Sequence, residues 1–141
     1  MKKTSMSLMI LCVVVLALAG CAPAADNLLA GTSWRMTSYG PASAQIAAAP
    51  ATSLVFGTDG QVSGNMGCNG MGGKYSVSGQ SITFGPLIST KMACEEPRMA
   101  QETEALKVFN GTVSFVLAGS TLTITSADGS SALTFVQVAA P

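Results

Sequence analysis

Hydrophobic and polar residues alternate in short runs along most of the chain, and turn-forming residues separate the runs at intervals of about eight to twelve residues. Alternation with a period of two puts successive side chains on opposite faces of a β-strand. Trp34 and Met36 share one face in this way, and Trp34, the only tryptophan, is predicted to anchor the core. The predicted strands are residues 32–39, 53–56, 61–64, 74–78, 81–84, 114–117, 121–125 and 133–136, with a further strand at 87–92.

Short turns join neighbouring strands, which predicts antiparallel pairing. Asp59-Gly60 supplies a hairpin turn, and Gly79-Gln80 joins the next pair of strands. Residues 40–50 are rich in alanine and proline and are predicted to form a loop. Parallel pairing would require several crossover helices, and the chain has one helical window. The predicted fold class is therefore mainly β (α+β), a small antiparallel meander of about eight strands with one helix.

The helical window follows residue 94. Pro97 stands near its start, where proline is tolerated, and Asn110-Gly111 is expected to end it. The predicted buried face consists of residues that recur at helical spacing, namely Met99, Thr103, Leu106 and Phe109. Glu102 and Glu104 are expected to lie on a solvated face.

The first residues of the chain resemble the signal of an exported lipoprotein. Residues 2 and 3 are lysines, residues 6–17 are almost purely apolar, and Leu18-Ala19-Gly20-Cys21 resembles the bacterial lipobox. This resemblance implies that the chain is cut before Cys21 and that Cys21 is lipidated. The alternative is an ordinary secretory signal with an incidental cysteine.

Cleavage before Cys21 divides the chain into a signal peptide (1–20), a tether (21–27) and one domain (28–138). Acyl chains contribute about 0.8 kcal/mol per buried methylene group, so they would hold the protein on a membrane. Ala22 follows the cysteine where an aspartate would resemble an inner-membrane retention signal. The expected location is therefore the outer membrane, facing the periplasm.

Cys68 and Cys94 are the two cysteines left in the exported domain, 26 residues apart. An oxidising compartment favours a disulfide between them. A zinc or redox site is the weaker alternative, because the chain has no Cys-x-x-Cys motif and no histidine.

Composition argues against several function classes. The absence of histidine excludes a Ser-His-Asp triad, and serine nucleophiles lack an activating base. Seven basic residues against seven acidic ones give no electrostatic footprint for nucleic acid. The adjacent Glu95 and Glu96 suit helix capping better than glycoside hydrolysis, which needs two opposed carboxylates. We therefore expect no catalytic residues, no metal and no cofactor.

The most informative segment is residues 64–75, a predicted glycine-dense loop. It contains Gly67-Cys68-Asn69, then Gly73 and Tyr75, and a second motif, Thr90-Lys91-Met92-Ala93-Cys94, precedes the helix. With Trp34 early in the chain and a closing hairpin over residues 122–135, these motifs resemble the META domain family of HslJ-like lipoproteins.

The resemblance implies a small antiparallel β-structure, partly barrel-like, with one helix. It also implies links to stress response, drug tolerance and virulence, and no catalytic residues. The predicted function is that of a non-enzymatic envelope lipoprotein that binds a protein partner. The candidate partner surface consists of Asn69, Lys74, Tyr75, Thr90 and Lys91. Met66 and Met71 either add to this surface or pack beneath the loop.

Two other functions remain open at this stage. A lipid-anchored binding module that inhibits lysozyme-type enzymes would also use a small β-barrel with a disulfide. An enzyme is the third hypothesis, although no convincing catalytic group supports it.

Overall fold

The structure is a computed structural model that describes residues 27–139. The predicted signal peptide, Cys21 and most of the tether lie outside the described residues. The strands are β1 (Thr32–Pro41), β2 (Ile46–Ala47), β3 (Ser53–Phe56), β4 (Gln61–Asn65), β5 (Gly70–Ser78), β6 (Ser81–Phe84), β7 (Ile88–Ser89), β8 (Gly111–Ala118), β9 (Thr121–Thr125) and β10 (Ser131–Val138). The helix is α1 (Arg98–Val108).

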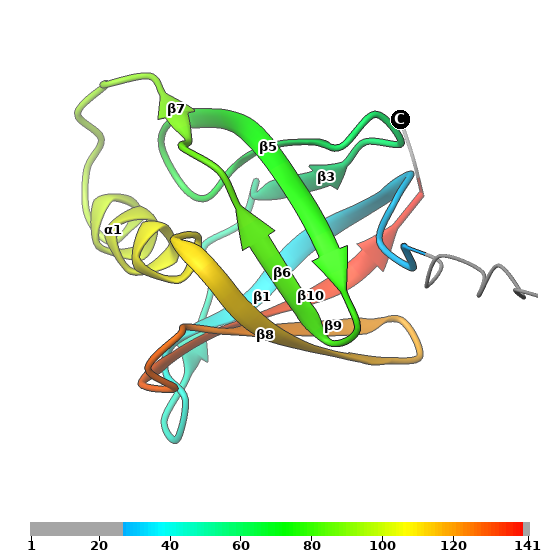
Figure 1. The fold of residues 1–141 in the computed structure, drawn as a ribbon. Helices are drawn as coiled ribbons and strands as arrows, with labels where there is room; N and C mark the ends of the chain where they lie inside the picture. Colours follow the sequence, from blue (N-terminus) through cyan, green and yellow to red (C-terminus); the bar gives the residue numbers. More distant parts are fainter. Residues whose placement is uncertain (1–26, 140–141) are drawn as a thin grey trace, which may run out of the picture.

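Eight of these strands close into an antiparallel barrel (Figure 1). The neighbours run β10-β9-β8-β6-β5-β4-β3-β1, and β1 pairs β10 from Ser33↔Val138 to Pro41↔Ser131 to complete the circle. The two short strands sit at the margins, β2 against β1 and β7 against β5. The predicted mainly β, antiparallel and barrel-like fold with one helix is confirmed.

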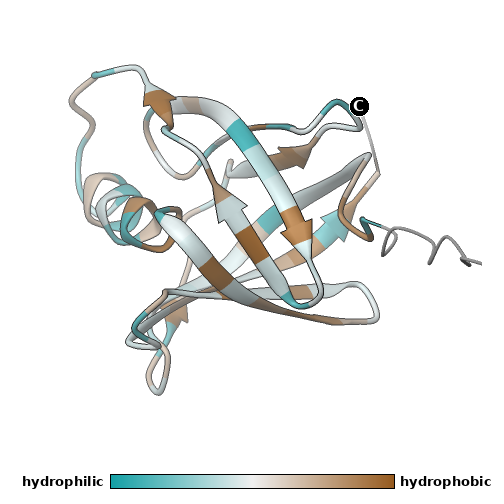
Figure 2. Ribbon diagram, viewed as in Figure 1, coloured by the Kyte–Doolittle hydropathy of each residue, from teal (hydrophilic) through white to brown (hydrophobic). Residues whose placement is uncertain are grey.

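The core fills the barrel with the inward members of each alternating pair, and Figure 2 shows the bands of hydropathy along the strands. A barrel of about eight strands has an interior just wide enough for side chains. Trp34 is 1% exposed and its Nε1 donates to Thr32 Oγ1 at 2.7 Å, so its predicted place in the core is confirmed. Phe56 packs edge-on against Tyr75, with ring centroids 4.9 Å apart.

The helix α1 lies with β7 at one end of the molecule, and the first and last described residues lie at the other (Figure 1). Its buried residues are Gln101, Glu102, Ala105 and Val108. The predicted apolar face is corrected, because Thr103 is exposed and Met99 and Leu106 are only partly buried. The prediction relied on apolar residues at helical spacing, and it missed the buried face because two of its residues, Gln101 and Glu102, are polar.

Three segments differ from their predicted structure. Residues 64–75 are mostly strand, since β4 runs to Asn65 and β5 begins at Gly70. The predicted strand at 87–92 pairs only at Ile88–Ser89. The 40–50 loop contains the short β2. Among residues 27–139, we find no helix with the length and apolar character needed to span a bilayer.

Candidate functional site

The Gly-Cys-Asn motif forms a tight turn, residues 65–69, between β4 and β5. Asn65 holds it from within: its Oδ1 accepts from the Gly67 backbone N–H at 2.8 Å, and its Nδ2 donates to the Cys68 carbonyl at 3.0 Å. Gly67 has a φ of +151°, and a Cβ there would lie 2.7 Å from the Arg98 carbonyl oxygen. The turn therefore requires glycine at this position.

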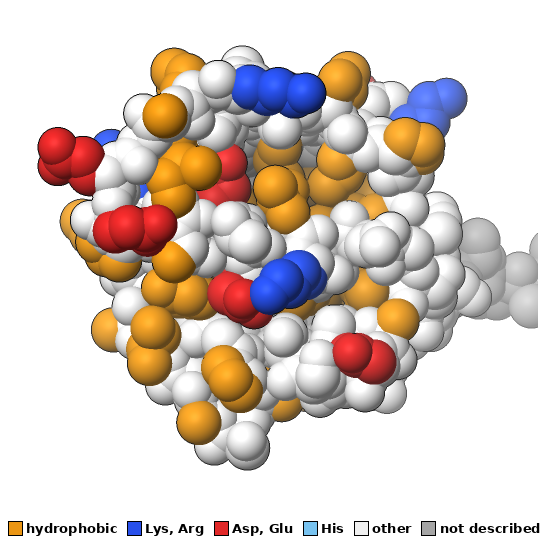
Figure 3. Space-filling model, turned by 90° about the vertical axis from the view of Figure 1, so that its left-hand side faces the viewer, with side chains coloured by type: hydrophobic (Ala, Val, Ile, Leu, Met, Phe, Trp, Pro, Cys, Tyr) orange, Lys and Arg blue, Asp and Glu red, His pale blue; other side chains and the backbone are white. Residues whose placement is uncertain are grey.

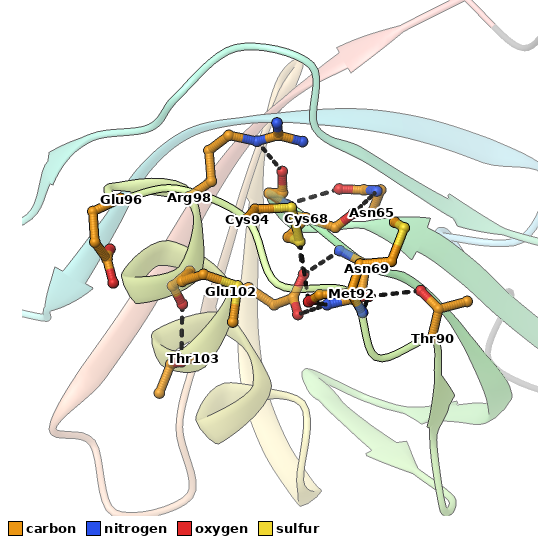
Figure 4. Close-up of a disulfide and its surroundings, with 12 residues drawn as sticks. Asn65, Cys68, Asn69, Thr90, Met92, Cys94, Glu96, Arg98, Glu102 and Thr103 are labelled. Carbon is orange, nitrogen blue, oxygen red and sulfur yellow. Dashed lines mark hydrogen bonds between the residues drawn. A yellow bond between two sulfur atoms is a disulfide. The ribbon is translucent and has the colours of Figure 1, made fainter.

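Asn69 joins this turn to the segment that follows β7 (Figure 4). Its Oδ1 accepts from Thr90 Oγ1 at 2.8 Å and from the Met92 backbone N–H at 2.7 Å. Its Nδ2 donates to the Met92 carbonyl at 3.2 Å and to Glu102 Oε1 at 2.7 Å. The amide is thus fully used in holding two loops and the helix together.

Glu102 reaches the turn from α1 and is 7% exposed. Its Oε2 accepts from the backbone N–H groups of Cys68, at 3.0 Å, and Asn69, while its Oε1 accepts the Asn69 amide. In the described part of the chain the one salt bridge is elsewhere, between Lys107 and Glu104. The predicted solvated position of Glu102 is corrected: the carboxylate is buried because three uncharged donors satisfy it.

Further contacts fix the turn from both sides. The predicted disulfide is confirmed, with Cys68 and Cys94 joined at an S–S distance of 2.00 Å. Gln101 Nε2 donates to the Met66 carbonyl at 2.7 Å, and Arg98 Nε donates to the Gly67 carbonyl at 2.6 Å. We call the turn together with its partners the motif network, which consists of residues 65–69, Thr90, Met92, Cys94, Arg98, Gln101 and Glu102.

The structure separates the residues of the predicted partner surface. Lys74, Thr90 and Lys91 are exposed, but Asn69 and Tyr75 are 5% and 6% exposed, so these two are corrected from surface to interior. They also lie six positions apart in the extended chain that enters and follows β5, and at a rise of about 3.3 Å per residue this separation is roughly 20 Å. Asn69 belongs to the motif network, whereas Tyr75 lies toward the opposite end of the barrel.

Tyr75 is held there by its hydroxyl group. The hydroxyl donates to the Gly57 carbonyl at 2.8 Å and accepts from Asn27 Nδ2 at 3.2 Å. Burial raises the pKa of Tyr75 above its usual value of 10.0. The residue therefore closes the end of the barrel near the first described residue.

The methionines of the two motif segments differ in their exposure. Met66 and Met71 are buried, 1% and 7% exposed, so they pack beneath the turn. Met92 is 56% exposed, and Ile88 on β7 is 80% exposed. The sequence placed Ile88 in a regular strand and missed this apolar surface. Pro86, which interrupts the approach to β7, was the available signal.

A slot of about 470 Å³ opens between β7 and the junction of α1 with β8. Figure 3 looks onto this end of the molecule, where hydrophobic side chains gather around a hollow. The slot is lined by Phe84, Gly85, Pro86, Leu87, Ser89, Leu106, Phe109, Asn110 and Gly111. Among residues 27–139, no group of three or more His, Cys, Asp or Glu side chains is placed to hold a metal ion.

The family model of the META domain matches residues 27–139. The chain belongs to the META domain family. Among solved structures, a Burkholderia xenovorans protein studied by NMR has 25% identity and a TM-score of 0.66, over 79% of this chain and 84% of that one. A DUF4847 family protein from Bacteroides vulgatus has 10% identity and a TM-score of 0.56, over 77% of this chain and 94% of that one, and shares the fold alone. No curated protein matches the chain.

Proposed function

We propose that this META domain protein is a non-enzymatic lipoprotein of the outer membrane that supports envelope integrity under stress by binding a protein partner. The partner surface is the end of the barrel that carries α1 and β7. The observation that carries the proposal is the exposure of Ile88 and Met92, 80% and 56%, in the segment whose residues Leu87 and Ser89 line the slot. An exposed apolar patch rimmed by polar residues is typical of an interaction surface.

The position of the anchor supports this orientation. Asn27 lies six positions after Cys21, and an extended chain spans at most about 3.6 Å per residue, so the tether reaches roughly 20 Å. Lipid on Cys21 would therefore keep the Asn27 end of the barrel near the bilayer. The α1 and β7 end, on the other side of the molecule, would face away from the membrane toward a partner (Figure 1).

The motif network supports a role without catalysis. The polar groups of Asn69 and Glu102 engage one another and the backbone of the turn, with both residues less than a tenth exposed. A catalytic carboxylate or amide needs access to substrate. These residues instead stabilise the end of the barrel that displays Ile88 and Met92.

The test is photo-cross-linking in cells that make the full-length lipoprotein, before and after heat stress. The photoreactive amino acid replaces Ile88 in one variant and Val116, a 58% exposed valine on β8, in the control. The proposal predicts that position 88 captures one dominant envelope protein and that position 116 does not. Capture of no protein at position 88, or the same set of proteins at both positions, would overturn it.

A further inference from the structure

The slot arises from a gap in the wall of the barrel. Strand β6 pairs β8 only from Ser81↔Ser114 to Phe84↔Gly111. Beyond Phe84 the chain follows β5, where the Gly85 backbone N–H donates to the Lys74 carbonyl at 2.9 Å. On the other side the chain before Gly111 belongs to α1 and its C-terminal cap. The two edges therefore diverge, and the slot opens between them.

The edge of β7 that faces this slot has free backbone groups. Strand β7 pairs only β5, with Gly72↔Ile88 and Met71↔Ser89 in register, and the Thr90 backbone N–H donates to the Gly70 carbonyl at 3.0 Å. In an antiparallel ladder, alternate residues direct their N–H and C=O groups to the same neighbour. Since Thr90 bonds to β5, Ile88 does too, and the N–H and C=O of Ser89 point away from β5. Ser89 lines the slot, so these groups are available to a new strand.

The lining of the slot has two chemical characters. Phe84 and Phe109 form an apolar floor, with ring centroids 5.1 Å apart in an edge-to-face arrangement. Leu87 and Leu106 are partly buried against the core and border that floor. Asn110 adds a side-chain amide, and none of the nine lining residues is charged. An uncharged occupant with both apolar side chains and amide groups matches this lining.

We propose that the slot binds an extended, uncharged peptide segment that adds a strand to β7 and seats one apolar side chain on the Phe84–Phe109 floor. This inference rests on the proposed function, because it names how the partner is held. Strand addition takes its affinity from main-chain hydrogen bonds and its specificity from pockets for alternate side chains. The volume of about 470 Å³ lies within the usual range for ligand pockets. An acyl chain would use the floor but leave the edge of β7 unpaired.

The test uses the same full-length lipoprotein in cells, with the photoreactive residue kept at position 88. Ser89→Pro removes the N–H that would pair with the added strand, at a position where no bond to β5 is lost. Ser89→Ala is the matched control, because it keeps that N–H. Leu106→Glu is a second variant, which places a charge at the border of the slot without changing β7. Resistance to protease and a non-reducing gel that reports the Cys68–Cys94 bond confirm that each variant is folded.

The proposal predicts that Ser89→Pro and Leu106→Glu each lower the yield of the cross-linked partner at least tenfold, while Ser89→Ala keeps it. In a separate variant the photoreactive residue replaces Leu106, which lines the slot, and mass spectrometry of the adduct from position 106 should identify an uncharged segment of the partner. An adduct from position 88 that neither variant weakens would overturn strand addition and leave the partner surface standing. Lipid captured at position 106 would also overturn it, in favour of an acyl chain. Failure to capture any protein at position 88 would overturn the proposed function as well.

Discussion

The motif network and the slot lie at the same end of the molecule, but the polar groups of the network are buried and those of the slot are accessible. In the motif network, Asn69 and Glu102 satisfy the backbone of the turn and one another, and both residues are less than a tenth exposed. In the slot, the edge of β7 and the amide of Asn110 face outward over an apolar floor. The buried residues of the motifs therefore stabilise this end of the barrel, and residues outside the motifs line the slot.

The largest expected effect is on stability, from Glu102→Ala. This change leaves three buried donors without an acceptor, and each costs about 1–3 kcal/mol, so the free energy of unfolding should fall by about 3–9 kcal/mol. Urea unfolding followed by the fluorescence of Trp34 measures it. The matched control is Glu104→Ala, which breaks only a surface ion pair and should cost less than about 0.5 kcal/mol. Equal losses from the two variants would place Glu102 outside the network that stabilises the fold.

Loss of the disulfide should have the next largest effect. The bond closes a loop of 26 residues, for which the chain-entropy model gives about 3–4 kcal/mol. The double variant Cys68→Ser, Cys94→Ser should unfold at a correspondingly lower urea concentration. Alkylation of the unreduced, denatured protein checks the bond itself, and labelling of both cysteines there would contradict it.

Two glycines of β5 should respond differently to alanine. A Cβ at Gly73 would lie 2.7 Å from Leu87 Cδ2 and 2.8 Å from the Pro86 carbonyl oxygen, whereas a Cβ at Gly70 meets nothing within 4 Å. Gly73→Ala should therefore cost about 1–3 kcal/mol through overpacking. Gly70→Ala should be neutral or stabilising by about 0.5 kcal/mol, because alanine restricts the unfolded chain. Thermal unfolding measures both variants. If Gly70→Ala lowers stability as much as Gly73→Ala, the space beside Gly70 is not open.

The turn between β9 and β10 should make the stability of the fold depend on pH. Asp128 accepts from Ser126 Oγ at 2.6 Å and from the backbone and side chain of Ser130, and these bonds lower the pKa of Asp128 from 3.8 to about 2. A lowered pKa means that the ionised carboxylate stabilises the fold above about pH 4 and that this contribution disappears as the pH falls toward 2. Asp128→Asn should remove that part of the acid dependence, as measured by unfolding at pH 2 to 5. An unchanged profile would contradict this origin.

Local signals predicted much of the fold. Asp59-Gly60 and Gly79-Gln80 formed the expected turns because turn chemistry acts over a few residues, and Gly60 and Gly79 have φ of +76° and +57°. The strands that flank them were placed correctly for the same reason. The closure of β1 on β10 could not be read from the pattern, because it joins residues about a hundred positions apart.

The site was less predictable than the fold. The first half of β5 was not predicted, because its glycines have a low strand propensity and take the place of outward side chains there. The burial of Glu102 depends on donors 33 and 34 residues away, so its own helix gave no sign of it. The slot depends on where β6 leaves β8, which is a property of the closed barrel.

The central claim is that the exposed side chains of the β7 end bind a partner while the buried side chains of the motif network only support that end. The direct measurement is the double variant Ile88→Ser, Met92→Ser, with the photoreactive residue in place of the exposed Lys91, compared with the parent chain carrying the same probe in the same cells. Both side chains are more than half exposed, so the free energy of unfolding should change by less than about 0.5 kcal/mol. The account predicts that this stable variant loses partner capture. Capture at the parent yield would contradict it.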